Sequence, residues 1–573
     1  MQKVTTKIFK SESNSIKFNF VGKEKKMYID NKILIGKSKD KELFIIPNKA
    51  NRHGLITGAS GSGKTITLKV MAESFSSMGV PVFLADVKGD LAGMCLPGES
   101  NEKIQERLNG IGIKDFSFKG FPTVFWDVFG KSGHPIRATL QSIGSTILSR
   151  MLGLNETQEG VLAIIFKIAR ENDLPLIDLK DLRLLLQYVA ENSKQYTITY
   201  GNIASQSVGS IQRSLLMLEE QGGDYFFGEP AIDINDFIKI NENGLGNINV
   251  LHATELYKQP TLYACFLLWL LTAINGTLPE VGDLDKPKMV FFFDEAHLLF
   301  DELPDYMLTQ VTQIVKLIRS KGIGLYFISQ SPKDIPDEIL AQLGNKVQHT
   351  LRAYTPAEQK VIKAVADSYR ANPEFNTEEA ISSLGTGEAL ISFMNEKGEP
   401  NIVEKATILP PQSQMGAIDD SIRLMVVSKS AFMGKYDTVV DRESAFEILS
   451  KEMEEKRAIE QEALKAKEEK KLREEQEKEQ VKAEKEAEKA KREEEKIRKE
   501  EEKAEEKARK EEERIRKEEE RQRKEFEKEA EKARKNSWQY KVGKQAERTA
   551  NSTINSVARK VATQILKNIF GGK

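Results

Sequence analysis

The sequence predicts an α/β fold: a core of alternating strands and helices that carries a helical insertion, followed by a long charged helix and a short amphipathic C-terminal helix. Three observations lead to this prediction. Short apolar runs alternate with helical patterns over the first 441 of the 573 residues, residues 136–245 read as consecutive helices, and residues 451–535 are mostly charged. Alternating strands and helices are typical of a parallel sheet covered by helices on both faces.

The strands expected in this sheet are short apolar runs bounded by turn residues. They cover residues 54–57, 81–85, 123–126, 248–253, 289–293, 324–329 and 346–352. Amphipathic helices are expected between the third and fourth strands, at 137–150, 156–171, 179–190 and 207–221. The order of elements predicts six segments: a short β-rich segment (1–50), the first part of the core (51–135), the helical insertion (136–245), the second part of the core (246–441), a charged strut (442–535) and a basic amphipathic tail (536–573).

A glycine-rich stretch after the first expected strand matches the phosphate-binding loop pattern G-x-x-x-x-G-K-[ST] at every specified position. Its residues are Gly58, Ala59, Ser60, Gly61, Ser62, Gly63, Lys64 and Thr65. In such a loop, backbone N–H groups converge on the phosphates, Lys64 reaches the β- and γ-phosphate oxygens, and the Thr65 hydroxyl binds Mg²⁺. Residues 66–77 continue as a helix, so the loop lies between a strand and a helix, as the motif requires. The sequence therefore predicts a nucleotide site with Mg²⁺; the alternative is a plain glycine-rich turn.

Two acids follow another buried strand much later in the chain. Residues 289–293 are continuously apolar, which suits a central strand covered on both faces, and Asp294 and Glu295 come directly after it. Because parallel sheets bind ligands at the carboxyl ends of their strands, we expect Asp294 to hold the Mg²⁺ shell and Glu295 to orient the attacking water. Together with the loop, these acids predict hydrolysis of ATP. The alternative is a helix N-terminus, where acidic residues are favourable in any case.

Composition and charge exclude several classes of protein. Lys and Arg total 86 against 87 Asp and Glu, so no overall basic field indicates a nucleic-acid partner. Two cysteines, Cys95 and Cys265, are too few for a disulfide scaffold, and five scattered histidines form no metal-ligand cluster. The N-terminus lacks the apolar core of a signal peptide, and the most apolar stretch, 262–274, is shorter than the roughly 20 residues that span a bilayer. We therefore expect a cytoplasmic protein without a transmembrane segment.

The charged region is unlike the rest of the chain. Residues 451–535 carry 63 charged side chains among 85, almost evenly divided between the two signs, and their large apolar residues keep no heptad spacing. This argues against a continuous coiled coil, whereas Glu–Lys and Glu–Arg pairs three and four residues apart favour a solvated single helix of about 125 Å. Disorder is the alternative. The tail then carries one apolar helical stripe, which predicts a docking helix: Ile554, Val557, Ala558, Val561, Ile565 and Ile569.

Several longer motifs occur in a fixed order around these landmarks. They read ADVKGDL at 85–91, GNI at 201–203, GGD at 222–224, DEAH at 294–297, IRSKG at 318–322, SQSPKDIP at 329–336 and QHTLRAYTP at 348–356. With the phosphate loop, they resemble the HerA/FtsK group of P-loop ATPases, and within it the HerA-like proteins of the YjgR type. The resemblance covers roughly residues 34–411.

The resemblance implies a RecA-like core, assembly into a homo-oligomer that is expected to be a hexameric ring, and DNA in its channel. It also gives roles to three further residues. Gln330, after the strand at 324–329, would sense the γ-phosphate or hold the water; Arg319 would enter the neighbouring subunit's site, with Arg352 as the second candidate. For either arginine the alternative is a surface or ion-paired side chain. HerA itself begins with a small β-barrel, for which the 50 residues before this loop are too short.

Other ATPases with similar motifs fit less well. DEAH also occurs in a large class of RNA helicases, but those need a Ser-Ala-Thr motif and a second RecA-like domain. This sequence has SQSP in place of the Ser-Ala-Thr motif and a single ATPase core. A transporter-type ATPase would need the signature LSGGQ, which the sequence lacks. Two function classes remain: an ATP-driven DNA translocase or helicase, acting alone or with a nuclease, and a ring-forming ATPase that switches or scaffolds a protein partner. The near-neutral charge favours the second class, and the resemblance favours the first.

Overall fold

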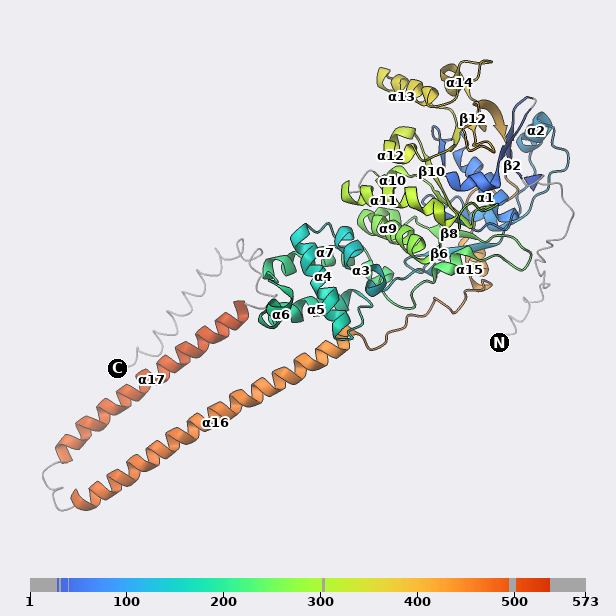
Figure 1. Cartoon of the computed structure of the whole chain (residues 1–573). Helices are drawn as coiled ribbons and strands as arrows, with labels where there is room; N and C mark the ends of the chain where they lie inside the picture. Colours follow the sequence, from blue (N-terminus) through green and yellow to red (C-terminus); the bar gives the residue numbers. More distant parts are fainter. Residues whose placement is uncertain (1–27, 30–31, 40, 301–304, 494–500, 536–573) are drawn as a thin grey trace, which may run out of the picture. The chain divides into compact units, whose positions relative to one another are not determined.

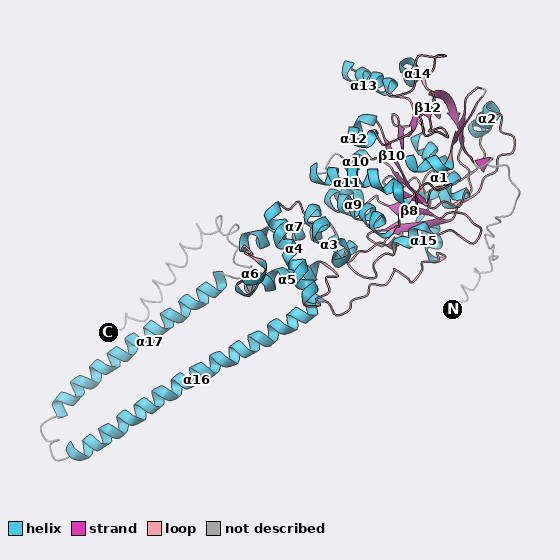
Figure 2. Cartoon of the chain, viewed as in Figure 1, coloured by secondary structure: helices cyan, strands magenta, loops and turns pink. Residues whose placement is uncertain are grey.

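The computed structural model describes residues 28–29, 32–39, 41–300, 305–493 and 501–535, and it divides the chain into two units, residues 1–456 and 457–573. The first unit contains one mixed sheet of 13 strands (Figures 1 and 2). Its strands are β1 (Tyr28–Ile29), β2 (Lys32–Lys37), β3 (Glu42–Ile45), β4 (Gly54–Thr57), β5 (Val82–Asp86), β6 (Thr123–Asp127), β7 (His134–Pro135), β8 (Ile248–His252), β9 (Met289–Phe293), β10 (Ile323–Ser329), β11 (Asn345–Gln348), β12 (Glu388–Ser392) and β13 (Glu404–Ile408). They lie in the order β1-β2-β13-β12-β11-β4-β10-β9-β5-β8-β6-β7, and β3 pairs with β2.

All seven strands expected from the sequence lie in the parallel part of this sheet, from β11 to β6. β4 and β9 have the expected bounds. The strand expected at 346–352 is wrong at its end, because β11 stops at Gln348. Beyond that point the chain follows the phosphate loop: the N–H of Ala59 donates to the carbonyl of Thr350 at 2.8 Å.

Antiparallel strands that the sequence did not reveal extend one side of the sheet. β11 pairs with β12, β12 with β13, and β13 with β2, where Thr407 lies opposite Lys37. The described part of the N-terminal segment is therefore an extension of the main sheet, which it joins through β2.

Helices cover both faces of the sheet and form the insertion (Figure 2). They are α1 (Lys64–Ser77), α2 (Glu102–Ile111), α3 (Leu140–Met151), α4 (Glu156–Glu171), α5 (Leu179–Glu191), α6 (Ser193–Tyr200), α7 (Ser205–Glu220), α8 (Gly223–Phe226), α9 (Pro260–Thr277), α10 (His297–Phe300), α11 (Asp305–Ile318), α12 (Asp337–Leu340), α13 (Pro356–Asp367), α14 (Thr377–Ser383), α15 (Asp420–Ser428), α16 (Ala445–Glu493) and α17 (Glu501–Lys535). The four helices expected in the insertion correspond to α3, α4, α5 and α7; α6 was not expected.

Side chains of β9 show how the two faces are covered. Val290 and Phe292 belong to the apolar core that includes α1 and α2, whereas Phe291 and Phe293 belong to the core that includes α9 and α11. Since successive side chains of a strand point to opposite faces, β9 is buried on both sides, as its continuous apolar run predicted.

α9 carries the most apolar stretch of the chain. By length and composition it is the one helix among the described residues that is apolar enough to cross a membrane. Over its 18 residues, 56% are buried inside the protein. Its side chains from Leu262 to Ile274 pack mostly in the core shared with the sheet and α11. The prediction of a buried helix is confirmed.

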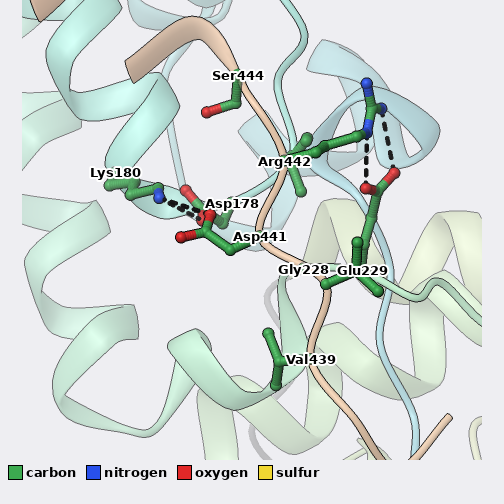
Figure 3. Close-up of a pocket in the computed structure, with 10 residues that line it drawn as sticks. Asp178, Lys180, Gly228, Glu229, Val439, Asp441, Arg442 and Ser444 are labelled. Carbon is green, nitrogen blue, oxygen red and sulfur yellow. Dashed lines mark hydrogen bonds and ion pairs between the residues drawn. The ribbon is translucent and has the colours of Figure 1, made fainter. Parts of the chain in front are cut away.

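The insertion helices α3 to α7 group together (Figure 1), and a strap, residues 435–444, connects them to the sheet; Figure 3 shows its insertion end, where Asp441 and Arg442 lie beside Lys180 and Glu229. At the sheet, Asp437 accepts a hydrogen bond from His134 at 2.8 Å. At the insertion, Arg442 donates to both carboxylate oxygens of Glu229, at 2.8 and 3.1 Å, and Lys180 donates to Asp441 at 3.0 Å. The strap therefore has two separate anchors.

The charged region begins within the first unit. Ala445 and Leu449 of α16 are buried, and Tyr188 of the insertion donates to Glu452 at 2.7 Å. The helix expected over 451–535 corresponds to α16 and α17; residues 494–500 lie outside the described residues, so one continuous helix stays a prediction. The amphipathic stripe of the tail, 554–569, also lies outside them.

Candidate active site

The phosphate loop lies at the carboxyl end of β4 and leads directly into α1. Gly58 and Gly63 have φ angles of 153° and 114°. A Cβ atom on Gly58 would lie 2.5 Å from Cβ of His349, and one on Gly63 would lie 3.3 Å from Cα of Gly387. Both the backbone conformation and the close contacts therefore require glycine at these two positions.

Lys64, the first residue of α1, folds over the loop. Its Nζ donates hydrogen bonds to the carbonyl oxygens of Gly58 at 2.7 Å and Ala59 at 3.2 Å. Burial lowers the pKa of Lys64, and the charge of Glu295 opposes this shift. The hydroxyl of Ser62 is buried and makes no hydrogen bond within the described residues. A cation and a donor thus lie where a loop of this type binds phosphate.

Asp294 and Glu295 lie at the same edge of the sheet, because β9 pairs in parallel with β10 and β10 with β4. Oδ2 of Asp294 and Oε2 of Glu295 are buried and make no hydrogen bond within the described residues. Burial raises the pKa of Asp294 to about 7, and the adjacent charge of Glu295 adds to this effect. A buried carboxyl group in this situation is stabilised by a bound cation.

Two basic groups contact Glu295. Lys88, after β5, forms an ion pair with Oε1, and Nδ1 of His297 lies 3.2 Å from Oε2. Burial acts to raise the pKa of Glu295, but the hydrogen bond and charge of Lys88 outweigh it and hold that pKa below its usual value. Glu295 also has a φ of 48°, which residues other than glycine rarely adopt. The glutamate is therefore ionised and held in a strained conformation, which is typical of functional sites.

The residues present fit Mg²⁺ bound together with a nucleotide. Thr65 is half-buried at the start of α1, and Asp294 has a free carboxylate oxygen. No group of three or more His, Cys, Asp or Glu among the described residues is arranged to hold a metal. Mg²⁺ is usually bound by one or two protein oxygens together with phosphates and water. Thr65 and Asp294 are the residues that would hold it.

Gln330 reaches the same edge of the sheet, directly after β10, and is exposed. The turn that follows is fixed by Asp334, which accepts hydrogen bonds from the hydroxyl of Ser329 and from the N–H of Ser331, the latter at 2.9 Å. The structure thus brings Gln330 to the edge that holds the loop and the two acids.

The two candidate arginines lie at opposite edges. Arg352 is exposed and follows Thr350, which accepts the hydrogen bond from Ala59 of the loop. Arg319 lies in the short 3₁₀ helix before β10, at the amino edge of the parallel strands. Because β4 has four residues of about 3.3 Å each, the two edges are about 13 Å apart. The structure does not bring Arg319 to the phosphate loop of its own chain.

His349 supports the loop, although the sequence gave it no expected role. Its Nε2 lies 2.8 Å from Oγ1 of Thr67 in α1, and its Nδ1 lies 2.9 Å from the carbonyl oxygen of Glu388. Burial lowers the pKa of His349 to about 4, so the ring is neutral at pH 7. The ordered motif at 348–356 contained this residue, just as the motif at 85–91 contained Lys88, so a signal for both was present.

Arg107 also lies beside the loop, and no sequence pattern pointed to it. Its Nη2 donates to the carbonyl of Thr386 at 2.9 Å, and the next N–H, of Gly387, donates to the carbonyl of Ser62 at 3.0 Å. Arg107 therefore fixes the segment that holds the loop from outside.

Comparison with known proteins gives consistent matches. Residues 31–509 match the family described as helicase HerA-like C-terminal. The chain is 24% identical over 386 residues to the DNA double-strand break repair helicase HerA of Sulfolobus acidocaldarius, covering 66% of this chain and 68% of that one. It is 24% identical over 361 residues to the protein of the same name from Saccharolobus solfataricus, covering 62% and 64%.

Two solved structures are similar to this chain. One is the plasmid coupling protein TrwB in complex with the GTP analogue GDPNP, with 14% identity and a TM-score of 0.45 over 67% of this chain and 92% of that one. The other is VirB4 of Thermoanaerobacter pseudethanolicus, with 15% identity and a TM-score of 0.42 over 69% and 99%.

Proposed function

Because the chain belongs to the helicase HerA-like C-terminal family, we propose that it is an ATP-hydrolysing motor that forms a ring and translocates or unwinds DNA. The names of its relatives in Sulfolobus and Saccharolobus support DNA as the substrate. The matched regions span 68% and 64% of those relatives. DNA handling by this chain is therefore part of the proposal.

ATP hydrolysis rests on one observation: Lys64, Asp294 and Glu295 meet at the carboxyl edge of the sheet, where buried oxygens of both acids make no hydrogen bond within the described residues. In the proposed reaction, the loop N–H groups and Lys64 bind the phosphates, and Thr65 and Asp294 would hold Mg²⁺, which would supply neutralisation of the phosphate charge. Glu295 orients the water that attacks the γ-phosphate.

The position of Arg319, one of three further polar residues with a proposed role, supports a ring. Gln330 and Arg352 lie at the edge of the sheet that carries the phosphate loop of the same chain. There Gln330 can hold the water and Arg352 can neutralise phosphate charge. Arg319 lies at the opposite edge, so in our proposal it acts on the nucleotide of a neighbouring subunit. Such a site needs a homo-oligomer, and we propose a hexamer in the cytoplasm.

An ATPase assay with and without duplex DNA over a salt series tests the proposal. We expect wild-type protein to hydrolyse ATP faster with DNA, and the stimulation to fall as salt rises, because backbone contacts are electrostatic. Lys64→Ala should remove hydrolysis, whereas Lys405→Ala, which breaks a 3.2 Å ion pair with Glu388, serves as the control. Hydrolysis that DNA leaves unchanged at every salt concentration would contradict the DNA motor while leaving the ATPase in place.

A second candidate function is an ATPase that switches or scaffolds a protein partner, such as a nuclease. It is supported by the net charge of −1 and by the exposed side chains of residues 454–471 in α16 and 509–530 in α17. ATPase activity that responds to a protein partner and ignores DNA would favour this function.

A further inference from the structure

A pocket of about 350 Å³ opens at the amino edge of the central parallel strands. Its lining contains five basic side chains: Arg52, Lys316, Arg319, Lys346 and Arg370. Within the described part of the chain, its lining contains no aspartate or glutamate. We call it the basic pocket.

Neighbouring strands bring these side chains together. Arg52 precedes β4, Arg319 precedes β10, and Lys346 is the second residue of β11. β4 lies between β10 and β11 and pairs in parallel with both, so the three residues share the amino edge. Arg370 follows α13 and lines the same pocket. The basic pocket is therefore on the edge opposite the phosphate loop.

The positive charges in the basic pocket are poorly compensated. Burial and the like charge of Arg52 lower the pKa of Arg319, against the opposing effect of Asp283. Burial alone lowers the pKa of Lys346. Lys316 pairs with Glu338 at 3.2 Å, but that carboxylate is 74% exposed and its residue does not line the pocket. Arg52, Arg319 and Lys346 are half-buried, and no carboxylate of a described residue lines the pocket beside them, which favours an anionic ligand.

His53 lines the basic pocket without adding charge. Its Nδ1 accepts a hydrogen bond from the N–H of Leu325 at 3.1 Å, and its Nε2 donates to the carbonyl of Val315 at 2.9 Å. Burial lowers the pKa of His53 to about 4. The five lysines and arginines thus account for the charge.

One part of the lining is apolar. It consists of Leu340, Leu343, Tyr369, Met394 and Pro400. Lys346 connects the two parts, because its Nζ lies 5.7 Å from the ring centre of Tyr369. A ligand that carries both phosphates and a flat, weakly polar group matches such a lining, and 350 Å³ is within the range of small-molecule sites.

We propose that the basic pocket binds a nucleotide, with its phosphates on the basic side chains and its nucleoside against the apolar ones. The nucleotide comes from one of two sources. It is free in solution, which is independent of the proposed function, or it is already held on the phosphate loop of a neighbouring copy, which rests on the proposed ring. A pocket of this volume does not admit a DNA duplex.

Calorimetric titration of the full chain with AMP-PNP and Mg²⁺ distinguishes the two sources. If the nucleotide is free, Lys64→Ala still binds one AMP-PNP per chain, and adding Lys346→Met or Arg370→Gln weakens that binding at least about tenfold, since a charged contact is lost. If it sits on a neighbour, Lys64→Ala binds none, whereas Lys346→Met in the otherwise native chain lowers ATP turnover at least about tenfold. Mixing Lys64→Ala with Lys346→Met then raises turnover above the sum of the two proteins measured separately.

The matched control is Lys405→Met. Lys405 is 42% exposed, pairs with Glu388 on an adjacent strand, and lies outside the basic pocket. The proposal would be overturned if Lys346→Met and Arg370→Gln behaved like this control in both binding and turnover. It would also be overturned if these two variants weakened DNA binding alone. Absence of hydrolysis by wild-type protein would instead contradict the proposed function and leave the free-nucleotide result to stand by itself.

Thermal unfolding separates ligand binding from a structural role. Without ligand, Lys346→Met should melt at or above the wild-type temperature, because it removes a half-buried charge that is poorly compensated. If the nucleotide is free, inorganic triphosphate should raise the melting temperature of Lys64→Ala, and adding Lys346→Met should remove that rise. Arg370 is exposed, so Arg370→Gln gives the same readout without risk to folding.

Discussion

Lys88 forms an ion pair with Glu295, although the two residues follow strands that are far apart in the sequence. β5 and β9 are neighbours in the sheet, so the residues after them meet at one edge. The proposed catalytic carboxylate is therefore both ionised and restrained by a half-exposed lysine. In the proposed reaction Glu295 must stay ionised, and its carboxylate must also contact water. The ion pair with Lys88 favours ionisation and restrains the carboxylate.

Replacing Lys88 with methionine should shift the acid limb of the ATPase pH profile to higher pH. Without the lysine, the effect of burial is less opposed, so the pKa of Glu295 rises. A higher pH is then needed to form the carboxylate. Lys88→Arg keeps a cation and should keep the profile. An unchanged acid limb in Lys88→Met would show that this pair does not control the ionisation of Glu295.

Glu295→Gln should bind ATP nearly as well as wild type and hydrolyse it at least about 100-fold more slowly, because the amide keeps the shape and loses the charge that polarises water. Single-turnover measurements separate binding from hydrolysis. Turnover near the wild-type rate would remove Glu295 from the proposed role.

Binding of Mg²⁺ and nucleotide should weaken as pH falls below about 7. The folded pKa of Asp294 is raised to about 7, so in ligand-free protein this group contributes stability at low pH that is lost as pH rises through 7. Mg²⁺ needs the ionised form, so its affinity changes in the opposite direction, by up to about tenfold per pH unit. Calorimetry in buffers of different ionisation enthalpy should detect proton release near pH 7, and Asp294→Asn should remove it.

Mixing Arg319→Ala with Lys64→Ala should restore part of the ATPase activity that each protein lacks alone. A mixed ring contains some sites with an intact phosphate loop from one subunit and an intact arginine from the next. Rescue requires an oligomer. Purely monomeric protein by sizing with ATP and Mg²⁺, at concentrations where hydrolysis is measured, would contradict both the ring and the role of Arg319.

Truncation after residue 456 should leave basal ATPase activity and thermal stability nearly unchanged, because every proposed catalytic residue lies before it. Truncation after 441 should lower the melting temperature. It removes Ala445 and Leu449 from the core and leaves Asp181, which is fully buried and accepts a hydrogen bond from Ser444 at 2.5 Å, without that partner. Equal stability of the two truncated proteins would show that the start of α16 adds nothing to the fold.

The sequence predicted the parts of this molecule that depend on local patterns. The loop, the acids after β9 and the bounds of β4 and β9 follow from short motifs and apolar runs. β2, β12 and β13 did not, because each is stabilised by a partner strand that is distant in sequence, and their own residues are only partly apolar. The strand at 346–352 was too long because Ala59 hydrogen-bonds to Thr350 and draws that segment onto the loop.

The same limit applies to the site. Lys64, Asp294 and Glu295 belong to motifs whose spacing carries the chemistry, whereas Lys88 contacts Glu295 through the order of strands in the sheet. The basic pocket is a stronger case. Its five cations come from separate elements, and no spacing in the chain relates Arg52 to Lys346 or Arg370.

The strap limits the distance between the sheet and the insertion. Asp437 is attached at the border of the sheet, and Ser444 is attached to Asp181 of the insertion. Seven residues of extended chain span at most about 25 Å, so the insertion cannot travel farther than this from the sheet while both anchors hold. Because α16 begins at Ala445, directly after the second anchor, a displacement of the insertion relative to the sheet would be passed directly to the first turn of that helix.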